Sequence, residues 1–136
     1  MPFEITYQGD FLFMRVFGVL TKRDLLNGAE EAEIVEKSLP TEMNRAIDVT
    51  SVETFEIDFP TILAVAERRR RRKYRRPIKS ALIARRPIEV GFARMFQTLN
   101  DHPQIEIRIV QSLQEAKDWF TEDMTGSRPE GDRSGS

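Results

Sequence analysis

Runs of aromatic and branched apolar residues alternate along the chain with segments in which apolar positions recur at helical spacing. Near the start, residues 3–7 and 11–20 are two strand-like runs separated by the turn signal Gln8-Gly9-Asp10, which predicts a β-hairpin. The second run is apolar at nearly every position. This is typical of a strand that is covered on both faces, so we expect it to lie inside a sheet.

The first two predicted helices follow start signals. Thr21 and Asp24 resemble a capping box, and an acidic amphipathic helix is expected from there to a stop at Pro40. After a short strand at residues 45–49 we expect a loop through Thr50 and Ser51. A second helix is predicted from near Asp58, and its apolar first turns run on into a long series of basic residues.

The C-terminal half repeats this alternation. A strand is predicted at residues 78–84, a helix from Pro87 to position 99, and a strand at 105–109 whose polar alternate positions favour a place near a sheet edge. Ser112 and Glu115 have the spacing of a capping box for a last helix. Residues from Thr125 onward lack large apolar side chains, so we expect a domain at 1–124 and a disordered tail at 125–136.

This element order predicts an α/β fold. Strands that alternate with helices indicate a mixed, mainly parallel sheet with right-handed crossovers, entered here by an antiparallel hairpin, with about five strands and four helices. The length of 136 residues and 40% hydrophobic content suit one domain. With no cysteine, no signal-like start and no long apolar stretch, we expect a cytoplasmic protein without a transmembrane segment.

Charge is unevenly distributed although the formal net charge is only −1. Residues 68–86 hold 11 basic and no acidic side chains. We expect the basic run to continue the second helix as far as Pro77, with charge on all sides of the axis and therefore no burial. The run consists of Arg68, Arg69, Arg70, Arg71, Arg72, Lys73, Tyr74, Arg75 and Arg76.

Two interpretations of the basic run stay open. It can be a solvated helix end, favoured by the helix dipole and partly neutralised by the acidic first helix. It can instead contact an anion. Nucleic acid would be bound through its phosphates, with Tyr74 as the one interleaved aromatic residue, and a membrane would be bound through anionic lipid head groups.

Candidate catalytic residues are few. His102 is the sole histidine and precedes Pro103 in an expected loop, where a histidine is usually solvated, and no nucleophile or phosphate-loop motif is present. Glu30 and Glu33 are more typical of the solvated face of a helix than of acid–base chemistry. We therefore expect no enzyme, no metal site and no cofactor. The stripe formed by Phe92 and Phe96 favours core packing over the lining of an apolar ligand pocket.

The chain resembles the STAS-like domains, which are named after sulfate transporters and anti-sigma-factor antagonists, and in particular their bacterial stand-alone, lipid-binding-like branch. The resemblance covers residues 3–121 and rests on the order of five landmarks. These are residues 18–21 with Asp24, and residues 45–49, 55–60, 79–84 and 110–120.

The resemblance implies a small non-enzymatic binding or regulatory module that contacts a protein partner or a small or lipid ligand, often through the loop between the third strand and the second helix. In anti-sigma-factor antagonists this loop carries an Asp-Ser pair whose serine is phosphorylated. Here Asp58 matches the aspartate, but Phe59 stands at the serine position, so the phosphorylation switch is not carried over. The nearby hydroxyl residues of this candidate partner or ligand loop are Thr50, Ser51 and Thr61. Asp58 also suits a helix cap.

Overall fold

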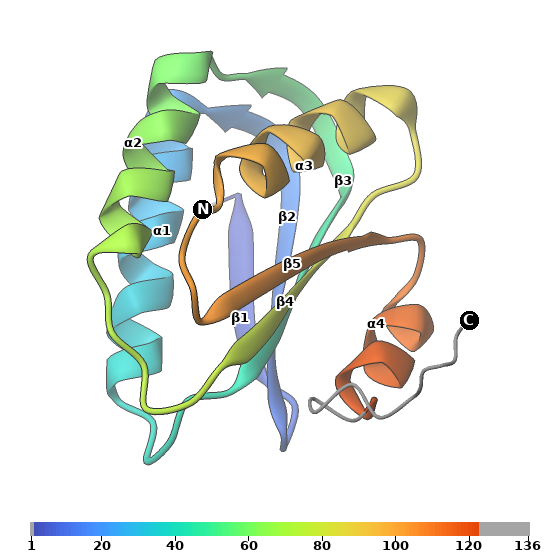
Figure 1. Ribbon diagram of the computed structural model, residues 1–136. Coiled ribbons are helices and arrows are strands. Elements are labelled where there is room, and N and C mark those ends of the chain that lie inside the picture. The colour runs from blue at the N-terminus through green and yellow to red at the C-terminus, as the bar shows by residue number, and fades with distance from the viewer. Residues whose placement is uncertain (1, 123–136) are drawn as a thin grey trace.

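The computed structural model describes residues 2–122 (Figure 1). These residues form five strands and four helices. The strands make one sheet, and the arrangement is the α/β fold expected from the sequence. The predicted disordered tail lies outside the described residues. Within the described part of the chain, no helix is long and apolar enough to cross a membrane.

The sheet has its strands in sequence order, and strand pairing is antiparallel only for the N-terminal hairpin. The three other strand pairs are parallel. This confirms the predicted hairpin and the predicted edge position of the last strand. The strands are β1 (Phe3–Tyr7), β2 (Phe11–Thr21), β3 (Asn44–Glu56), β4 (Ile78–Ile83) and β5 (Ile105–Val110).

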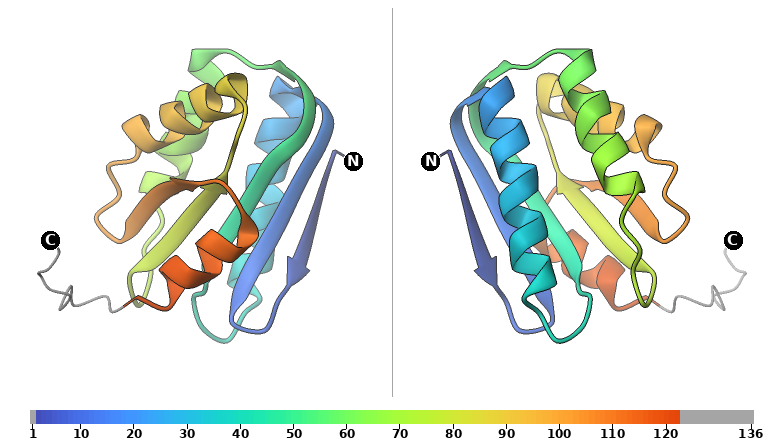
Figure 2. Two further views of the ribbon diagram at one scale, coloured as in Figure 1. Left: turned by 90° about the vertical axis from the view of Figure 1, so that its right-hand side faces the viewer. Right: turned by 90° about the vertical axis from the view of Figure 1, so that its left-hand side faces the viewer.

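The helices divide unequally between the two faces of the sheet. Because the parallel strands are added in one direction and crossovers are right-handed, the three crossover helices lie on the same face. Of the helices in residues 2–122, only the one after the last strand lies on the other face, as the two views in Figure 2 show. The helices are α1 (Lys22–Lys37), α2 (Phe59–Arg70), α3 (Pro87–Leu99) and α4 (Leu113–Phe120).

Each face of the sheet carries its own hydrophobic core, and strand β4 contributes to both. Every residue of β4 is buried. Leu82 belongs to the larger core beneath α1, α2 and α3, whereas Ala81 and Ile83 pack with Trp119 of α4. Successive side chains of a strand point to opposite faces, so one short strand supports two packed layers.

Helix starts follow the predicted caps closely. Thr21 and Asp24 form the expected capping box, in which each side chain accepts a hydrogen bond from the other residue's backbone N–H. Asp58 is the N-cap of α2. At α4 the Ser112 side chain accepts from the backbone N–H of Glu115, but the Glu115 carboxylate accepts from Gln111 instead of from Ser112.

Two element boundaries differ from the prediction. Strand β3 continues to Glu56, so Thr50 and Ser51 lie in a strand and not in a loop; pairing with β2 across two register shifts extends it. Helix α2 ends at Arg70, with Arg71 as its C-cap, and does not reach Pro77. The helix stops there because the following segment turns and buries Tyr74 in a small cluster with two residues of the sheet, Ile78 and Ile105.

Strand β2 lies inside the sheet as expected, but the prediction that both of its faces are covered was only half right. On the face toward α1, Leu12, Val16 and Leu20 are buried and Met14 between them is partly buried. The opposite face is covered at its beginning, where Phe11 packs against Phe120 of α4. Farther along, Val19 is 44% exposed, since a helix of eight residues is too short to cover the whole face.

Candidate functional site

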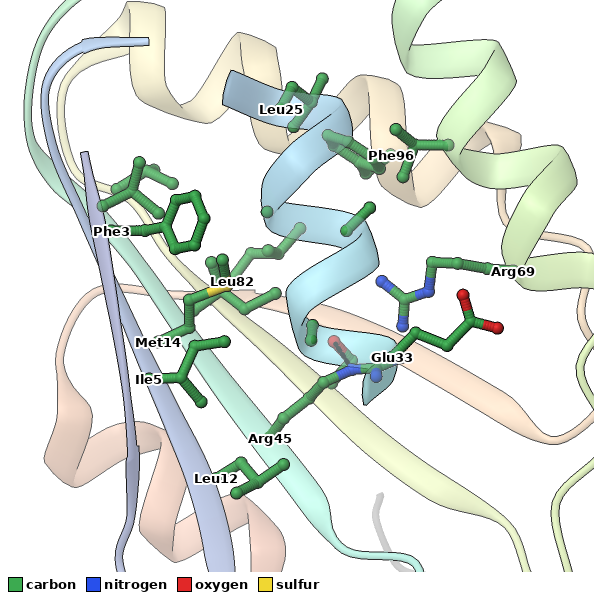
Figure 3. Close-up of a pocket in the computed structure, with 18 of the residues that line it drawn as sticks. Phe3, Ile5, Leu12, Met14, Leu25, Glu33, Arg45, Arg69, Leu82 and Phe96 are labelled. Atoms are coloured by element: carbon green, nitrogen blue, oxygen red, sulfur yellow. Dashed lines mark hydrogen bonds between the residues drawn. The ribbon is translucent and has the colours of Figure 1, made fainter. Parts of the chain in front are cut away.

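A cavity of about 110 Å³ lies between the sheet and the three helices on the larger-core side. Most of its wall is apolar and is formed by all five strands together with α1, α2 and α3. Figure 3 shows side chains from the hairpin, from the central strands and from α1, α2 and α3 around the space. Representative apolar lining residues are Phe3, Met14, Leu25, Leu82 and Phe96.

The cavity exists because the inner face of α1 carries small side chains. Gly28, Ala29 and Ala32 all line it. At Gly28 the helix lies close to the sheet, since a Cβ atom there would come within 3.2 Å of the Met14 Cε atom. Beyond Gly28 the small alanine side chains do not fill the space between helix and sheet. Helix α1 therefore approaches the sheet closely at one point and leaves an opening farther along.

A cluster of charged residues closes one end of the cavity. Two glutamates of α1, Glu33 and Glu36, face arginines that come from β3, from α2 and from the turn after α2. The Arg68 Nε atom lies 2.9 Å from Glu33 Oε1. The Arg72 Nη1 atom lies 2.6 Å from Glu36 Oε1, and Arg45 donates to the other oxygen of Glu36. Helix α1 is thereby joined electrostatically to β3 and α2.

The two ion pairs of Glu36 are largely removed from water, whereas the Arg68 side chain that pairs with Glu33 is exposed. The side chains of Arg45, Glu36 and Arg72 are 8%, 11% and 15% exposed. Burial acts to raise the pKa of Glu33, but the hydrogen bond and the charge of Arg68, together with the charges of Lys37 and Arg72, outweigh it and hold this pKa below its ordinary value. Glu33 therefore acts as a half-buried anion.

Three buried donors at this end of the cavity have no hydrogen-bond partner among residues 2–122. They are Nη2 of Arg45, Nη2 of Arg69 and the hydroxyl of Tyr74. Figure 3 shows the guanidinium groups of Arg45 and Arg69 pointing toward the segment of α1 that carries Glu33. Burial lowers the pKa of Arg69, and the neighbouring charge of Arg72 acts in the same direction. The site thus contains cationic and hydroxyl donors that the described chain leaves unsatisfied.

The basic run is divided between the cavity and the surface. Arg68, Arg69 and Arg72 line the cavity, and Tyr74 is buried with the Arg72 guanidinium 5.0 Å from the centre of its ring. The prediction that the run is a continuous exposed helix was therefore wrong. The expectation that the acidic first helix neutralises part of the run is confirmed.

The remaining basic side chains of the run face outward. Arg70 pairs with Asp101, with 2.8 Å between Nε and Oδ1, and Arg75 lies 3.5 Å from Glu42. Within residues 2–122 the other three cations are exposed and form no ion pair. They are Arg71, Lys73 and Arg76.

A solved structure with the same architecture is an uncharacterized protein of the DUF3478 family from Shewanella loihica PV-4, described as having a SpoIIAA-like fold. The two superpose with a TM-score of 0.59, and the match covers 87% of this chain and 91% of that chain at 17% sequence identity. This chain has the SpoIIAA-like fold. The predicted STAS-like fold is confirmed at that level. No family model and no curated protein matches the sequence.

In this SpoIIAA-like fold the predicted partner loop does not meet the cavity. Asp58 accepts hydrogen bonds from the backbone N–H and hydroxyl of Thr61, at 3.0 and 2.6 Å. These bonds, with the nearby charge of Lys22, hold the pKa of Asp58 below its ordinary value. Phe59 is 53% exposed beside them. The expected capping role of Asp58 is confirmed, because its carboxylate accepts hydrogen bonds from the first turn of α2.

Two of the three hydroxyl residues that the sequence placed near that loop, Thr50 and Ser51, lie in β3 and form hydrogen bonds there. The backbone N–H and the hydroxyl of Thr50 both donate to Asp48 Oδ1, at 2.8 and 2.6 Å. The Ser51 hydroxyl accepts from Arg15 at 3.3 Å. None of the five predicted loop residues lines the cavity.

His102 is buried, contrary to the expectation of a solvated loop histidine. Its Nδ1 atom accepts the backbone N–H of Gln104 at 3.0 Å, so the Nε2 atom donates to the Arg72 carbonyl. Its ring also lies 5.3 Å from that of Tyr74. The histidine is 7% exposed and fixes the turn that follows α2. Its two ring nitrogens are thus occupied by the backbone.

Sequence reasoning missed most of this site. The sequence patterns do not mark Arg45 or Glu36 as site residues, and they predict a solvated helix face for Glu33. They favour core packing for Phe92 and Phe96; Phe92 is buried in the core, and both also line the cavity. Two signals point to the site. One is Arg45 directly before the apolar residues of a strand, and the other is the aromatic Tyr74 inside a basic run.

Proposed function

We propose that this protein is a non-catalytic binding module that takes a small apolar ligand into the cavity between the sheet and helices α1, α2 and α3. The observation that carries the proposal is an apolar cavity of about 110 Å³ inside the larger core. An engineered apolar cavity of roughly 150 Å³ is enough to bind benzene in another protein. A ligand of a few carbon atoms is thus of suitable size.

The contacts of the sole histidine support a binding role over a catalytic one. Both ring nitrogens of His102 are engaged by the backbone of the turn after α2. The carboxylates near the cavity are likewise engaged, Glu33 and Glu36 by arginines and Asp24 by the helix cap. No general base of ordinary type is left facing the apolar space among the described residues.

Two other roles have less support. Binding of nucleic acid or anionic lipid head groups by the basic run would have to rely on few cations, because Arg68, Arg69 and Arg72 line the cavity. Regulation of a protein partner through the loop before α2 would have to proceed without the serine, since Phe59 occupies its position. The cavity therefore supports a more specific role than the basic run or the loop before α2 does.

The test is a titration of the protein with 1-hexanol, followed by amide NMR shifts of the residues around the cavity. Binding should move resonances of lining residues such as Val49 and Leu82, and saturation at about a hundredfold excess over Kd should stabilise the protein by about 2.7 kcal/mol. Ala32→Leu fills the space and should abolish binding. Ala64→Leu places the same side chain on the exposed side of α2 and should bind as wild type does.

The proposal would be contradicted if wild type, Ala32→Leu and Ala64→Leu all bound 1-hexanol equally well. It would also be contradicted if 1-hexanol moved no amide resonance around the cavity of the wild type. Because Ala32→Leu also adds bulk to a packed region, its folded state is checked by the dispersion of the same NMR spectra.

A further inference from the structure

Three donors that need an acceptor lie at one end of the cavity. Nη2 of Arg45 comes from β3, Nη2 of Arg69 from α2 and the Tyr74 hydroxyl from the turn beyond α2. All three belong to residues that line the same space. A buried polar group without a partner lowers the stability of the fold, and the cost is larger when the group is charged. An acceptor entering the cavity would remove that cost at several atoms at once.

The charge of this end of the cavity also favours an anion. Four arginines (Arg45, Arg68, Arg69 and Arg72) face two glutamates, Glu33 and Glu36, which leaves an excess of two positive charges. Asp24 lines the cavity as well, but its carboxylate accepts the backbone N–H of Thr21 at the start of α1.

The glutamates are engaged by arginines other than Arg69. Glu33 lies 2.9 Å from Arg68 and 3.8 Å from Arg72, and Glu36 pairs with Arg72 and Arg45. Within residues 2–122 no ion pair is formed by Arg69. Burial lowers its pKa, the charge of Arg72 acts in the same direction, and Tyr74 beside it opposes both without outweighing them. The two glutamates therefore position the neighbouring arginines and leave Arg69 available.

We propose that the charged end of the cavity binds the oxyanion of an amphiphilic ligand, a carboxylate or a phosphate ester, whose short alkyl chain occupies the apolar part. Arg69 is the principal anion-binding residue, and Arg45 and Tyr74 donate beside it. The guanidinium group suits this task because its donors match the oxygens of a carboxylate or a phosphate. The inference rests on the proposed function, since it assigns the head group of the ligand that the cavity takes.

The experiment compares three probes with the same alkyl chain: 1-hexanol, hexanoate and hexyl phosphate. Affinities are measured by calorimetry for wild type, Arg69→Met and Arg71→Met. Wild type should bind at least one of the two anions about tenfold or more tightly than hexanol, and Arg69→Met should lose this preference while keeping its affinity for hexanol. Arg71→Met, which removes an exposed arginine two positions away, should behave as wild type does. Comparing the two anions shows which head group is preferred.

A second variant, Tyr74→Phe, shows whether a loss of anion binding in Arg69→Met comes from the lost donor or from a general disturbance of the cavity. Tyr74→Phe removes only the unpartnered hydroxyl and should weaken anion binding severalfold without changing hexanol binding. The inference is overturned if wild type binds hexanol but neither anion more tightly, or if Arg69→Met keeps the anion preference. In those cases the cavity still binds apolar ligands, and the proposed function stands. If no probe binds, both proposals fail.

Discussion

Lys79 and Arg69 carry buried cationic donor atoms on opposite faces of the sheet, and the surroundings of these atoms are opposite. Lys79, 3% exposed, donates from its ammonium group to the carbonyl oxygens of Trp119 and Glu122, at 2.7 and 3.1 Å, and lies over the Trp119 ring. Arg69 has a buried Nη2 atom without a partner among the described residues. A buried cation satisfied by its own chain stabilises the fold. A buried cation left unsatisfied indicates a partner from outside it.

The strongest test of this comparison is Glu36→Gln, which removes the negative charge that pairs with Arg45 and Arg72 and replaces one acceptor oxygen by a donor. Arg45 and Arg72 would be left as buried charges without their counterion, and breaking a buried pair in this way costs about 3–5 kcal/mol. The free energy of unfolding in urea measures the effect. Glu30→Gln, an exposed position of the same helix, should change it by less than about 0.5 kcal/mol. Equal stabilities of the two variants would show that these pairs contribute nothing.

A smaller effect, with opposite signs, is expected from the two cations themselves. Lys79→Met leaves two carbonyl groups without their charged donor and should lower the free energy of unfolding by about 2–3 kcal/mol. Arg69→Met removes an unsatisfied buried donor and should leave stability unchanged or raise it by about 1 kcal/mol. Both are measured by urea unfolding without ligand. A loss at Arg69 as large as that at Lys79 would mean that Arg69 is satisfied within the fold.

The smallest effect concerns acid stability. Because the pKa of Glu33 is lowered in the folded protein from its ordinary 4.5, the stabilisation is fully present above that value. It is lost as the pH falls through the lowered folded value. Between about pH 7 and pH 3, Glu33→Gln should therefore lose less stability than wild type, as followed by thermal unfolding at each pH. An unchanged pH slope would show that the carboxylate is not stabilised by its arginines.

The element order and most boundaries could be predicted from sequence because they depend on local signals. The hairpin, the capping residues Thr21 and Asp58, the edge strand and the helix opened by Pro87 all follow from spacing, turn residues and caps. The end of α2 could not be located in this way. Consecutive arginines carry no periodicity, and the turn after Arg71 forms because Tyr74 packs on Ile78 and on Ile105, the second of which is distant from α2 in the chain.

The site was less predictable because it depends on how α1 faces the sheet. Gly28, Ala29 and Ala32 look like ordinary small helix residues, and only their position opposite Met14 and the arginines turns them into a cavity wall. Burial of Arg69 follows from the same placement. The charge of the basic run alone indicated a solvated surface. The fold instead places Arg68 beside Glu33 and Arg72 beside Glu36 of the neighbouring helix α1.

The sequential order of the strands has a consequence for the way the chain folds. Each strand pairs with the strand that precedes it in the chain, and the parallel pairs join residues 27 to 35 positions apart across one helical crossover. Closing a crossover costs entropy before the strand pairing repays it, so parallel pairing is intrinsically slow. The sheet can nevertheless grow by one strand and one helix at a time, because no strand has to wait for one that comes later in the chain. The charged cluster, which needs only α1, β3, α2 and the turn after α2, can form before the last strand is added.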